Sequence, residues 1–161
     1  SGGEPLLEKD FLLEALIRCK QAGIHTCLDT AGCGDGDYGE ILRYTDLVLM
    51  DIKHYTEEGY RKVTGMDFEA SRRFLETVQQ MNVPMWIRHV VVPGLTDGET
   101  HLEGLKTYIQ SLKNVERVEL LPYHVLGVHK YKALGIPYPL EGVEPMNPEL
   151  LSDWQIRMNT I

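Results

Sequence analysis

Charged and polar side chains gather at the ends of four apolar segments of this sequence. Asp29 and Asp51 each come directly after a short apolar run, and Lys53 follows two residues later. Arg88 lies inside the third apolar segment, and His124 comes just after the fourth. If the segments are parallel strands of one sheet, their carboxyl ends meet at one edge. We therefore expect these five side chains to form one binding site.

The two aspartates predict a cation site. Hard cations prefer carboxylate, hydroxyl and backbone carbonyl oxygens, and Thr30 and the Leu49 carbonyl lie close in sequence to Asp29 and Asp51. An aspartate at a strand end is also a common helix N-cap, so either aspartate alone fits both roles. Two of them on adjacent predicted strands favour a shared cation.

The basic side chains predict an anionic ligand. Lys53 and Asp51 lie on the same side of an extended strand, so Lys53 either orients a ligand or pairs with Asp51. Arg88 needs a partner within its apolar strand because an unpaired buried charge is costly, and its fork fits a carboxylate. His89 points the opposite way, which predicts a structural role, and we expect His101 on a helix surface.

The cysteines and the first residues support different expectations. Cys19, Cys27 and Cys33 fit no metal site and are predicted to be small core residues. Their odd number without framework spacing indicates a reducing, cytoplasmic context, and the absence of HxH and HExxH argues against a zinc hydrolase. In Gly2-Gly3-Glu4, adjacent glycines let the backbone approach a ligand, and Glu4 is able to accept from an ammonium group.

Strands and helices alternate along the chain. Short continuous apolar runs predict buried parallel strands at about 24–28, 47–51, 85–91 and 115–121. Every predicted strand ends in polar groups and no GxGxxG follows one, which favours a barrel over a doubly wound sheet. Helices are expected at the apolar stripe of residues 11–19, at 68–81, after a capping box at 96–99, and from Pro148 behind Asn147.

Composition limits the class of protein. The 161 residues fit one domain, 1–161, and 43% are hydrophobic. The net charge of −8 argues against nucleic-acid binding, which needs clustered Lys and Arg. No apolar run approaches the roughly 18 residues that span a bilayer, so no membrane partner is expected.

Five stretches resemble the pyruvate formate-lyase activating enzymes, a radical S-adenosylmethionine family that activates glycyl radical enzymes. They run in the family's order over almost the whole chain, and only their combination is specific. The stretches are SGGEP at 1–5, GIHTCLDTAG at 23–32, TDLVLMDIK at 45–53, WIRHVVVPG at 86–94 and VERVELLPYHVLGVHKY at 115–131.

The resemblance implies a fold and a set of roles. The family folds as a partial barrel of six β/α units, and this chain corresponds to about the last four, a C-terminal fragment that begins at the end of the second strand. The implied site residues are Gly2, Gly3 and Glu4 at the amino group of S-adenosylmethionine, Asp29, Thr30, the Leu49 carbonyl and Asp51 around a monovalent cation, and Lys53, Arg88, Val90 and His124 along the cofactor pocket.

One departure from the family concerns the cluster. The family uses CxxxCxxC to hold three irons of a 4Fe–4S cluster, and that motif is absent from the 161 residues. In the family it lies upstream of the position matched by residue 1. We therefore expect the chain alone to be inactive, and its first strand to present an unpaired edge that invites association.

The resemblance also implies partners. The parent enzyme is expected to cleave S-adenosylmethionine reductively at the cluster, with an electron donor such as flavodoxin, and to generate a glycyl radical on pyruvate formate-lyase. Related activators often carry cysteine-rich insertions, and this sequence has none. Pyruvate formate-lyase is therefore the favoured partner.

Two alternatives stay open at the level of sequence. One is a barrel aldolase that uses Lys53 as a Schiff base, which needs a neutral amine, whereas neighbouring Asp51 stabilises the charged form. The other is a binding domain without catalysis. The expected convergence of the five strand-end side chains on one edge argues against it, and a structure that placed them on different faces would remove the predicted site.

Overall fold

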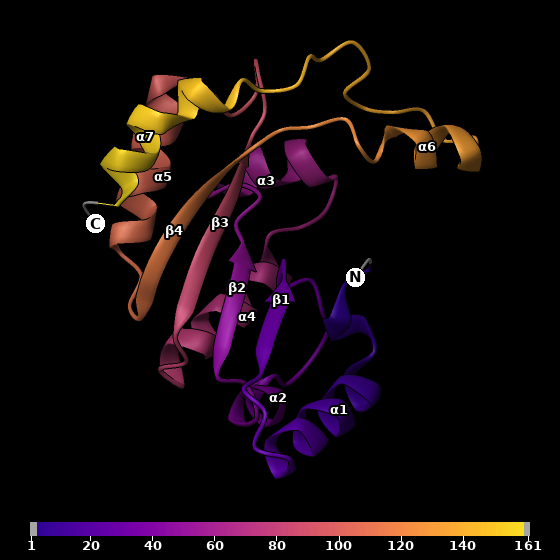
Figure 1. Cartoon of the computed structure of the whole chain (residues 1–161), viewed down its shortest axis with the longest axis vertical. Helices are drawn as coiled ribbons and strands as arrows, with labels where there is room; N and C mark the ends of the chain where they lie inside the picture. The colour runs from indigo at the N-terminus through magenta and orange to yellow at the C-terminus, as the bar shows by residue number, and fades with distance from the viewer. Residues whose placement is uncertain (1–2, 160–161) are drawn as a thin grey trace.

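Four parallel strands form the centre of the molecule in this computed structural model, which describes residues 3–159 (Figure 1). Each strand pairs with its neighbour in sequence, in the order β1-β2-β3-β4. This order lacks the reversal of a doubly wound sheet and is that of a barrel segment, so the predicted α/β class is confirmed. The strands are β1 (Cys27–Thr30), β2 (Leu47–Asp51), β3 (Met85–Val91) and β4 (Val115–Pro122).

The strand predictions hold for β2 and β3, and β4 is one residue longer than predicted. The first strand begins at Cys27 rather than near Ile24. Its predicted start is wrong because Thr26 is engaged elsewhere: its amide donates to the Asp46 carboxylate at 2.8 Å and its hydroxyl to the Tyr44 carbonyl at 2.6 Å. These bonds hold the segment before β1 to the loop before β2.

Helices follow the strands, and several were not predicted from sequence. The elements α2, α3 and α6 are short, and α6 lies far from the sheet, beyond β4 (Figure 1). The helices are α1 (Lys9–Gln21), α2 (Gly39–Arg43), α3 (Glu57–Thr64), α4 (Glu69–Gln80), α5 (Glu99–Gln110), α6 (Val128–Leu134) and α7 (Ser152–Met158), with 3-10 turns η1 (Pro5–Leu7) and η2 (Pro148–Leu151).

The core lies between one face of the sheet and helices α2, α4 and α5. The predicted apolar side of α4 is confirmed, since Phe74, Leu75 and Val78 are buried. This packing leaves the other face of the sheet free for a site. The strand residues in the core include Leu28, Val48, Met50, Met85, Ile87, Val91 and Val118.

One helix-level prediction is wrong, one holds in part and one is refined. Thr96 does not cap α5: its hydroxyl accepts from the Val92 amide at 2.8 Å and donates to the Val90 carbonyl at 3.1 Å, and Gly98 is the N-cap residue. The predicted apolar stripe of α1 holds in part, since Leu16 is buried and Leu12 packs against the core, whereas Phe11 is 78% exposed. Asn147 does cap, accepting from the Glu149 amide at 3.0 Å, but it begins η2 before α7.

Within residues 3–159, no helix combines the length and the hydropathy that a bilayer crossing requires.

Candidate functional site

Alternate strand residues point away from the core, because successive side chains of a strand face opposite sides. Leu28 and Thr30 face the core layer, whereas Asp29 between them is exposed. By the same alternation β2 and β3 turn further predicted site residues toward the open face. The predicted residues on this face are Asp29, Leu49, Asp51, Arg88 and Val90.

One arginine in the middle of β3 joins the ends of β1 and β2. The Arg88 Nε donates to Asp51 Oδ1 at 2.8 Å, and its Nη2 donates to Asp29. The Lys53 ammonium donates to Asp51 Oδ2 at 3.0 Å. Asp51 is the register partner of Arg88 in the β2–β3 ladder, so the ladder itself sets their separation. The structure therefore brings together four side chains that the sequence predicted to meet.

The network is partly buried and partly open. The side chain of Arg88 is 19% exposed and that of Asp51 is 24% exposed, whereas Asp29 is 57% exposed. Burial alone would lower the pKa of the Arg88 guanidinium, but Asp51 and Asp29 outweigh it and raise that pKa. The guanidinium stays charged, and three of its five N–H groups remain for a ligand. Asp29 is the member of the network that solvent reaches most easily.

Glu4 fastens the start of the chain to the end of β1. Its carboxylate accepts from the Ala31 amide at 3.0 Å, from the Leu6 amide at 3.2 Å and from the Thr30 hydroxyl. The same hydroxyl accepts from the Gly32 amide at 2.8 Å. A carboxylate has about four acceptor positions, so Glu4 retains one. The Thr30 hydroxyl, in contrast, already has protein partners on both sides.

A cavity of about 770 Å³ opens beside the network. The 3-10 turn η1 and the start of α1 form one wall, and β1, the end of β2 and Arg88 in the middle of β3 form the other. Gly2 lies outside the described residues, and Gly3 lies in the left-handed region at φ 85°. The lining residues used here are Gly3, Glu4, Cys27, Asp29, Asp51 and Arg88.

Some predicted residues lie outside this cavity. His124 is exposed, two residues beyond the end of β4, and does not line the cavity. Val90 is half-buried on the open face, one step along β3 from Arg88. Lys53 reaches the network through Asp51 without lining the cavity. The predicted set therefore divides into a connected group around Arg88 and an outlying His124.

The cysteine prediction is wrong. Cys27 is exposed and lines the cavity, and Cys19 and Cys33 are half-buried. Burial and then the Asp29 carboxylate raise the pKa of the Cys27 thiol, and Arg88 opposes them. Cys27 lies two residues before Asp29, and this spacing places both on one face of β1. That spacing is the sequence signal that marks Cys27 as a lining residue.

Sequence reasoning also missed a histidine cluster behind the site. His101 was expected on a helix surface, but its Nε2 lies 3.1 Å from the Nε2 of buried His89, and its ring packs against His54. The prediction that His89 is structural agrees with its 1% exposure. Within residues 3–159, no group of three or more His, Cys, Asp or Glu side chains is arranged to hold a metal ion.

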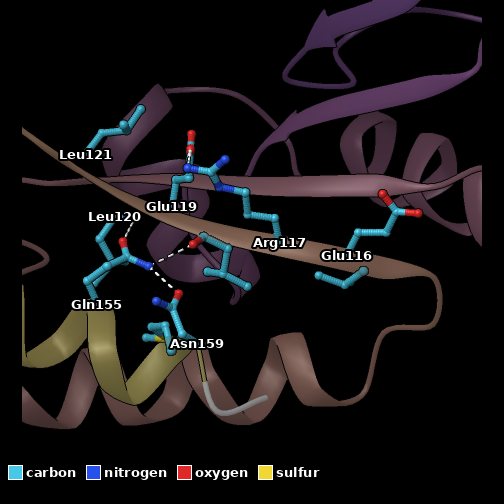
Figure 2. Close-up of a pocket in the computed structure, with 10 residues that line it drawn as sticks. Glu116, Arg117, Glu119, Leu120, Leu121, Gln155 and Asn159 are labelled. Atoms are coloured by element: carbon cyan, nitrogen blue, oxygen red, sulfur yellow. Dashed lines mark hydrogen bonds and ion pairs between the residues drawn. The ribbon is translucent and has the colours of Figure 1, made fainter.

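A second cavity, of about 640 Å³, lies along the outer edge of β4 (Figure 2). The amide of Gln155 on α7 donates to the Val118 carbonyl and accepts from the Leu120 amide, both at 2.8 Å. Figure 2 shows Arg117 and Glu119 on the same strand, and these two form an ion pair at 2.6 Å. This cavity contains none of the predicted strand-end residues. We therefore interpret this cavity as part of the contact by which α7 closes the outer edge of the sheet.

Comparison with known proteins identifies relatives of this chain. The family described as the Radical SAM superfamily matches residues 1–103. The chain is 50% identical over 149 residues to a pyruvate formate-lyase-activating enzyme of Clostridium pasteurianum, which covers 92% of this chain and 63% of that protein. It is 46% identical over 160 residues to one of Staphylococcus epidermidis, covering 95% and 64%. The chain thus spans less than two thirds of these relatives' length.

A solved structure shares the fold. It is a domain of a pyruvate-formate lyase-activating enzyme from Bacteroides vulgatus, similar with a TM-score of 0.76 over 99% of this chain and 90% of that one. The sequences are 24% identical, so this likeness speaks for the fold alone.

Proposed function

Because this chain belongs to the radical SAM superfamily, we propose that it is the cofactor-binding part of an enzyme that activates pyruvate formate-lyase. The identity to activating enzymes supports this proposal. The observation that carries it is the Arg88 network at the strand ends, beside a cavity of about 770 Å³. S-adenosylmethionine bound with a reduced 4Fe–4S cluster would supply the radical that removes a hydrogen atom from a partner glycine.

The residues present fit the polar end of that cofactor. Its carboxylate is matched by the free N–H groups of Arg88 and by the Lys53 ammonium. Its amino group is matched by the remaining acceptor position of Glu4 and by the backbone at Gly3, and we propose that Gly2, which lies outside the described residues, belongs to the same motif. In this proposal Val90 and His124 line the outer part of the pocket.

We further propose a monovalent cation at Asp29 and Asp51, with the Leu49 carbonyl and Thr30 as further ligands. Arg88 now bridges the two carboxylates. A cation at the same oxygens competes with that bridge and frees guanidinium N–H groups for the cofactor's carboxylate. The cation and the cofactor would then bind cooperatively.

The first test measures S-adenosylmethionine binding by calorimetry with the purified chain. Arg88→Ala removes a charge-assisted hydrogen-bond donor, which contributes about 1.5–3 kcal/mol, so we expect affinity to fall by about tenfold or more. Arg72→Ala is the matched control, because Arg72 is exposed on α4 and pairs with Glu69 and Glu76. Equal affinities for the two variants contradict the proposed pocket.

The cation is tested by replacing sodium and potassium salts with choline chloride at constant ionic strength. We expect weaker S-adenosylmethionine binding in choline. Asp29→Asn, which removes one carboxylate charge, is expected to abolish the difference between the salts. A wild-type affinity that is independent of the cation rejects the cation site and leaves the cofactor pocket standing.

The activity belongs to the whole enzyme in this proposal. The spacings of Cys19, Cys27 and Cys33 do not form CxxxCxxC, so the 161-residue chain is expected to yield no 5′-deoxyadenosine. The full-length enzyme, reconstituted anaerobically with iron, sulfide and reduced flavodoxin, is expected to yield it and to give the glycyl radical signal of pyruvate formate-lyase by electron paramagnetic resonance. An active full-length protein without a cluster overturns the proposal.

A Schiff-base aldolase is disfavoured by the geometry. The Lys53 amine pairs with Asp51 Oδ2 at 3.0 Å and does not line the cavity, whereas a Schiff-base lysine has to present its amine to the substrate. Borohydride trapping of an aldehyde or ketone on Lys53 would restore that alternative.

A further inference from the structure

Three imidazole rings lie in series behind the site, from β3 through α5 to the loop after β2. His89 on β3 is 1% exposed, and its Nε2 lies 3.1 Å from the Nε2 of His101 on α5. The His101 ring meets the His54 ring edge-on, with centroids 4.8 Å apart. On its other side, the His89 Nδ1 lies 2.7 Å from the Ile52 carbonyl oxygen. The series therefore ends at the backbone of Ile52, the residue that follows β2.

The direction of each hydrogen bond follows from the Ile52 carbonyl. A carbonyl oxygen only accepts, so His89 Nδ1 carries the hydrogen. Burial lowers the pKa of His89 to about 4, so the ring is neutral at pH 7 and its Nε2 is an acceptor. The donor in the pair is therefore the Nε2–H of His101. The Ile52 carbonyl thus selects the tautomer of His89, and His89 in turn selects that of His101, whose donated hydrogen supports the same His89 tautomer.

Ile52 is held on both of its backbone groups. Its carbonyl accepts from His89, and its amide donates to the Arg88 carbonyl at 2.9 Å. The residues on either side of Ile52 are Asp51 and Lys53, whose side chains pair at 3.0 Å. Fixing this residue fixes the path of the backbone between the two charged side chains.

We propose that His89 and His101 are positioning residues, which hold the Asp51–Lys53 segment in the geometry needed to bind the polar end of the ligand. This inference rests on the proposed function only for the nature of that ligand. The tautomers themselves follow from the protein's own contacts. Neither histidine touches the cavity; both act through Ile52.

The packing around His54 keeps His101 in place. A Cβ at Gly59 on α3 would lie 2.1 Å from the His54 ring, so only glycine permits α3 to approach there. The His54 ring also stacks on Tyr55, with centroids 4.9 Å apart. On the other side, a Cβ at Gly104 of α5 would lie 2.2 Å from the Tyr55 hydroxyl. The closely packed aromatic layer limits the rotation of His101.

The first experiment reads the tautomers directly. Long-range ¹H–¹⁵N correlation spectra of the ¹⁵N-labelled chain at pH 7, without any ligand, are expected to show His89 with its hydrogen on Nδ1 and His101 with its hydrogen on Nε2. A spectrum with His89 protonated on Nε2 overturns the proposal. This result does not depend on whether the chain binds S-adenosylmethionine.

The second experiment separates positioning from packing. His101→Gln places an amide donor near the original Nε2, whereas His101→Leu offers none. We expect His101→Leu to reduce the Nδ1–H population of His89 and to weaken S-adenosylmethionine binding by on the order of fivefold, the worth of one hydrogen bond. His101→Gln is expected to restore both, and His129→Leu, at an exposed position on α6, to change neither.

The outcomes are distinguishable. If the wild type shows the assigned tautomers but binds no S-adenosylmethionine, the proposed function fails and the hydrogen-bond assignment stands. If the wild type binds the cofactor and both His101→Leu and His101→Gln bind it as tightly as the wild type does, the positioning role is rejected. A His101→Gln variant that binds as weakly as His101→Leu also rejects it, because a donor at that position would then make no difference.

Discussion

At the scale of residues, Arg88 holds together the charged side chains at the strand ends. Two carboxylates on adjacent strands repel one another when they share a partly buried site. The guanidinium of Arg88 bridges Asp51 and Asp29, which offsets that repulsion. The site is therefore organised before any ligand arrives. A ligand or a cation has to exchange with existing contacts rather than fill an unstructured space.

The histidine pair predicts acid sensitivity of the fold. Burial lowers the pKa of His89 to about 4 and that of His101 to about 4. Between about pH 6.5 and pH 4 these histidines are protonated in the unfolded chain but stay neutral in the folded chain. The free energy of unfolding is therefore highest above about pH 6.5 and decreases as the pH falls through this range. The groups that surround the pair are His54, Lys53, Asp51 and Asp97.

Urea unfolding at several pH values measures this effect. Almost fully buried His89 contributes on the order of 3 kcal/mol of loss across that window. His89→Asn, whose amide keeps a donor toward Ile52, is expected to flatten the dependence of the free energy of unfolding on pH. His129→Gln, at an exposed position, is expected to leave the slope unchanged. An equal slope in wild type and His89→Asn contradicts the assignment.

The residues around Arg88 were predictable from sequence, and the histidine pair was not. Asp29, Asp51 and Arg88 follow from strand ends and a period of two, which are local patterns. The position of His101 depends on which strand lies under α5, and helical spacing carries no information on that. The bonds of Glu4 to Thr30 and Ala31 span 26 and 27 residues. They likewise depend on tertiary contacts.

At the scale of elements, the outer edge of β4 is closed by a side chain. The Gln155 amide pairs with the carbonyl of Val118 and the amide of Leu120, which are groups that a fifth strand would use. Its Nε2 also donates to Asn159 at 2.8 Å, which holds the amide in orientation. A free strand edge invites pairing with another chain. Helix α7 therefore protects the sheet.

Gln155→Leu tests this closure. Two backbone groups lose their partners, at about 0.5–1.5 kcal/mol for each hydrogen bond, so we expect a lower free energy of unfolding and more self-association in sedimentation velocity. Gln155→Glu still accepts from Leu120 but does not donate to Val118, so an intermediate effect is expected. Asp153→Asn, exposed on the same helix, is the control. Unchanged stability in Gln155→Leu shows that the edge is protected otherwise.

The elements themselves were partly predictable. Continuous apolar runs located β2 and β3, whose alternate residues are buried while the others are half-buried, and the period of α4 matched its buried side. The same method was wrong for Thr96, whose hydroxyl bonds to Val90 and Val92 rather than to the first turn of α5. A capping pattern indicates only which hydrogen bonds a residue is able to form. In the loop between β3 and α5, Thr96 forms other hydrogen bonds than the predicted cap.

At the scale of the whole molecule, the β1 side of the sheet is the less covered one. Within residues 3–159, β1 pairs with β2 alone, and the neighbouring helix α1 leaves Phe11 78% exposed and η1 leaves Leu7 64% exposed. Both residues also line the cavity beside the network. Large exposed apolar side chains in one region mark an interaction surface or an aggregation liability.

This exposure predicts that the 161-residue chain self-associates through its β1 side. Sedimentation equilibrium is expected to show concentration-dependent association that Phe11→Gln reduces, because the substitution removes apolar area worth about 25 cal/mol per Å² buried. Leu126→Gln is the matched control, since Leu126 is also strongly exposed, at 75%, but lies beyond β4 near α6. If Leu126→Gln reduces association as much as Phe11→Gln does, the association is a general effect of apolar surface. If only Phe11→Gln reduces it, the uncovered side of β1 is the contact, and S-adenosylmethionine titrations should then be run below the association concentration, where the cavity is open.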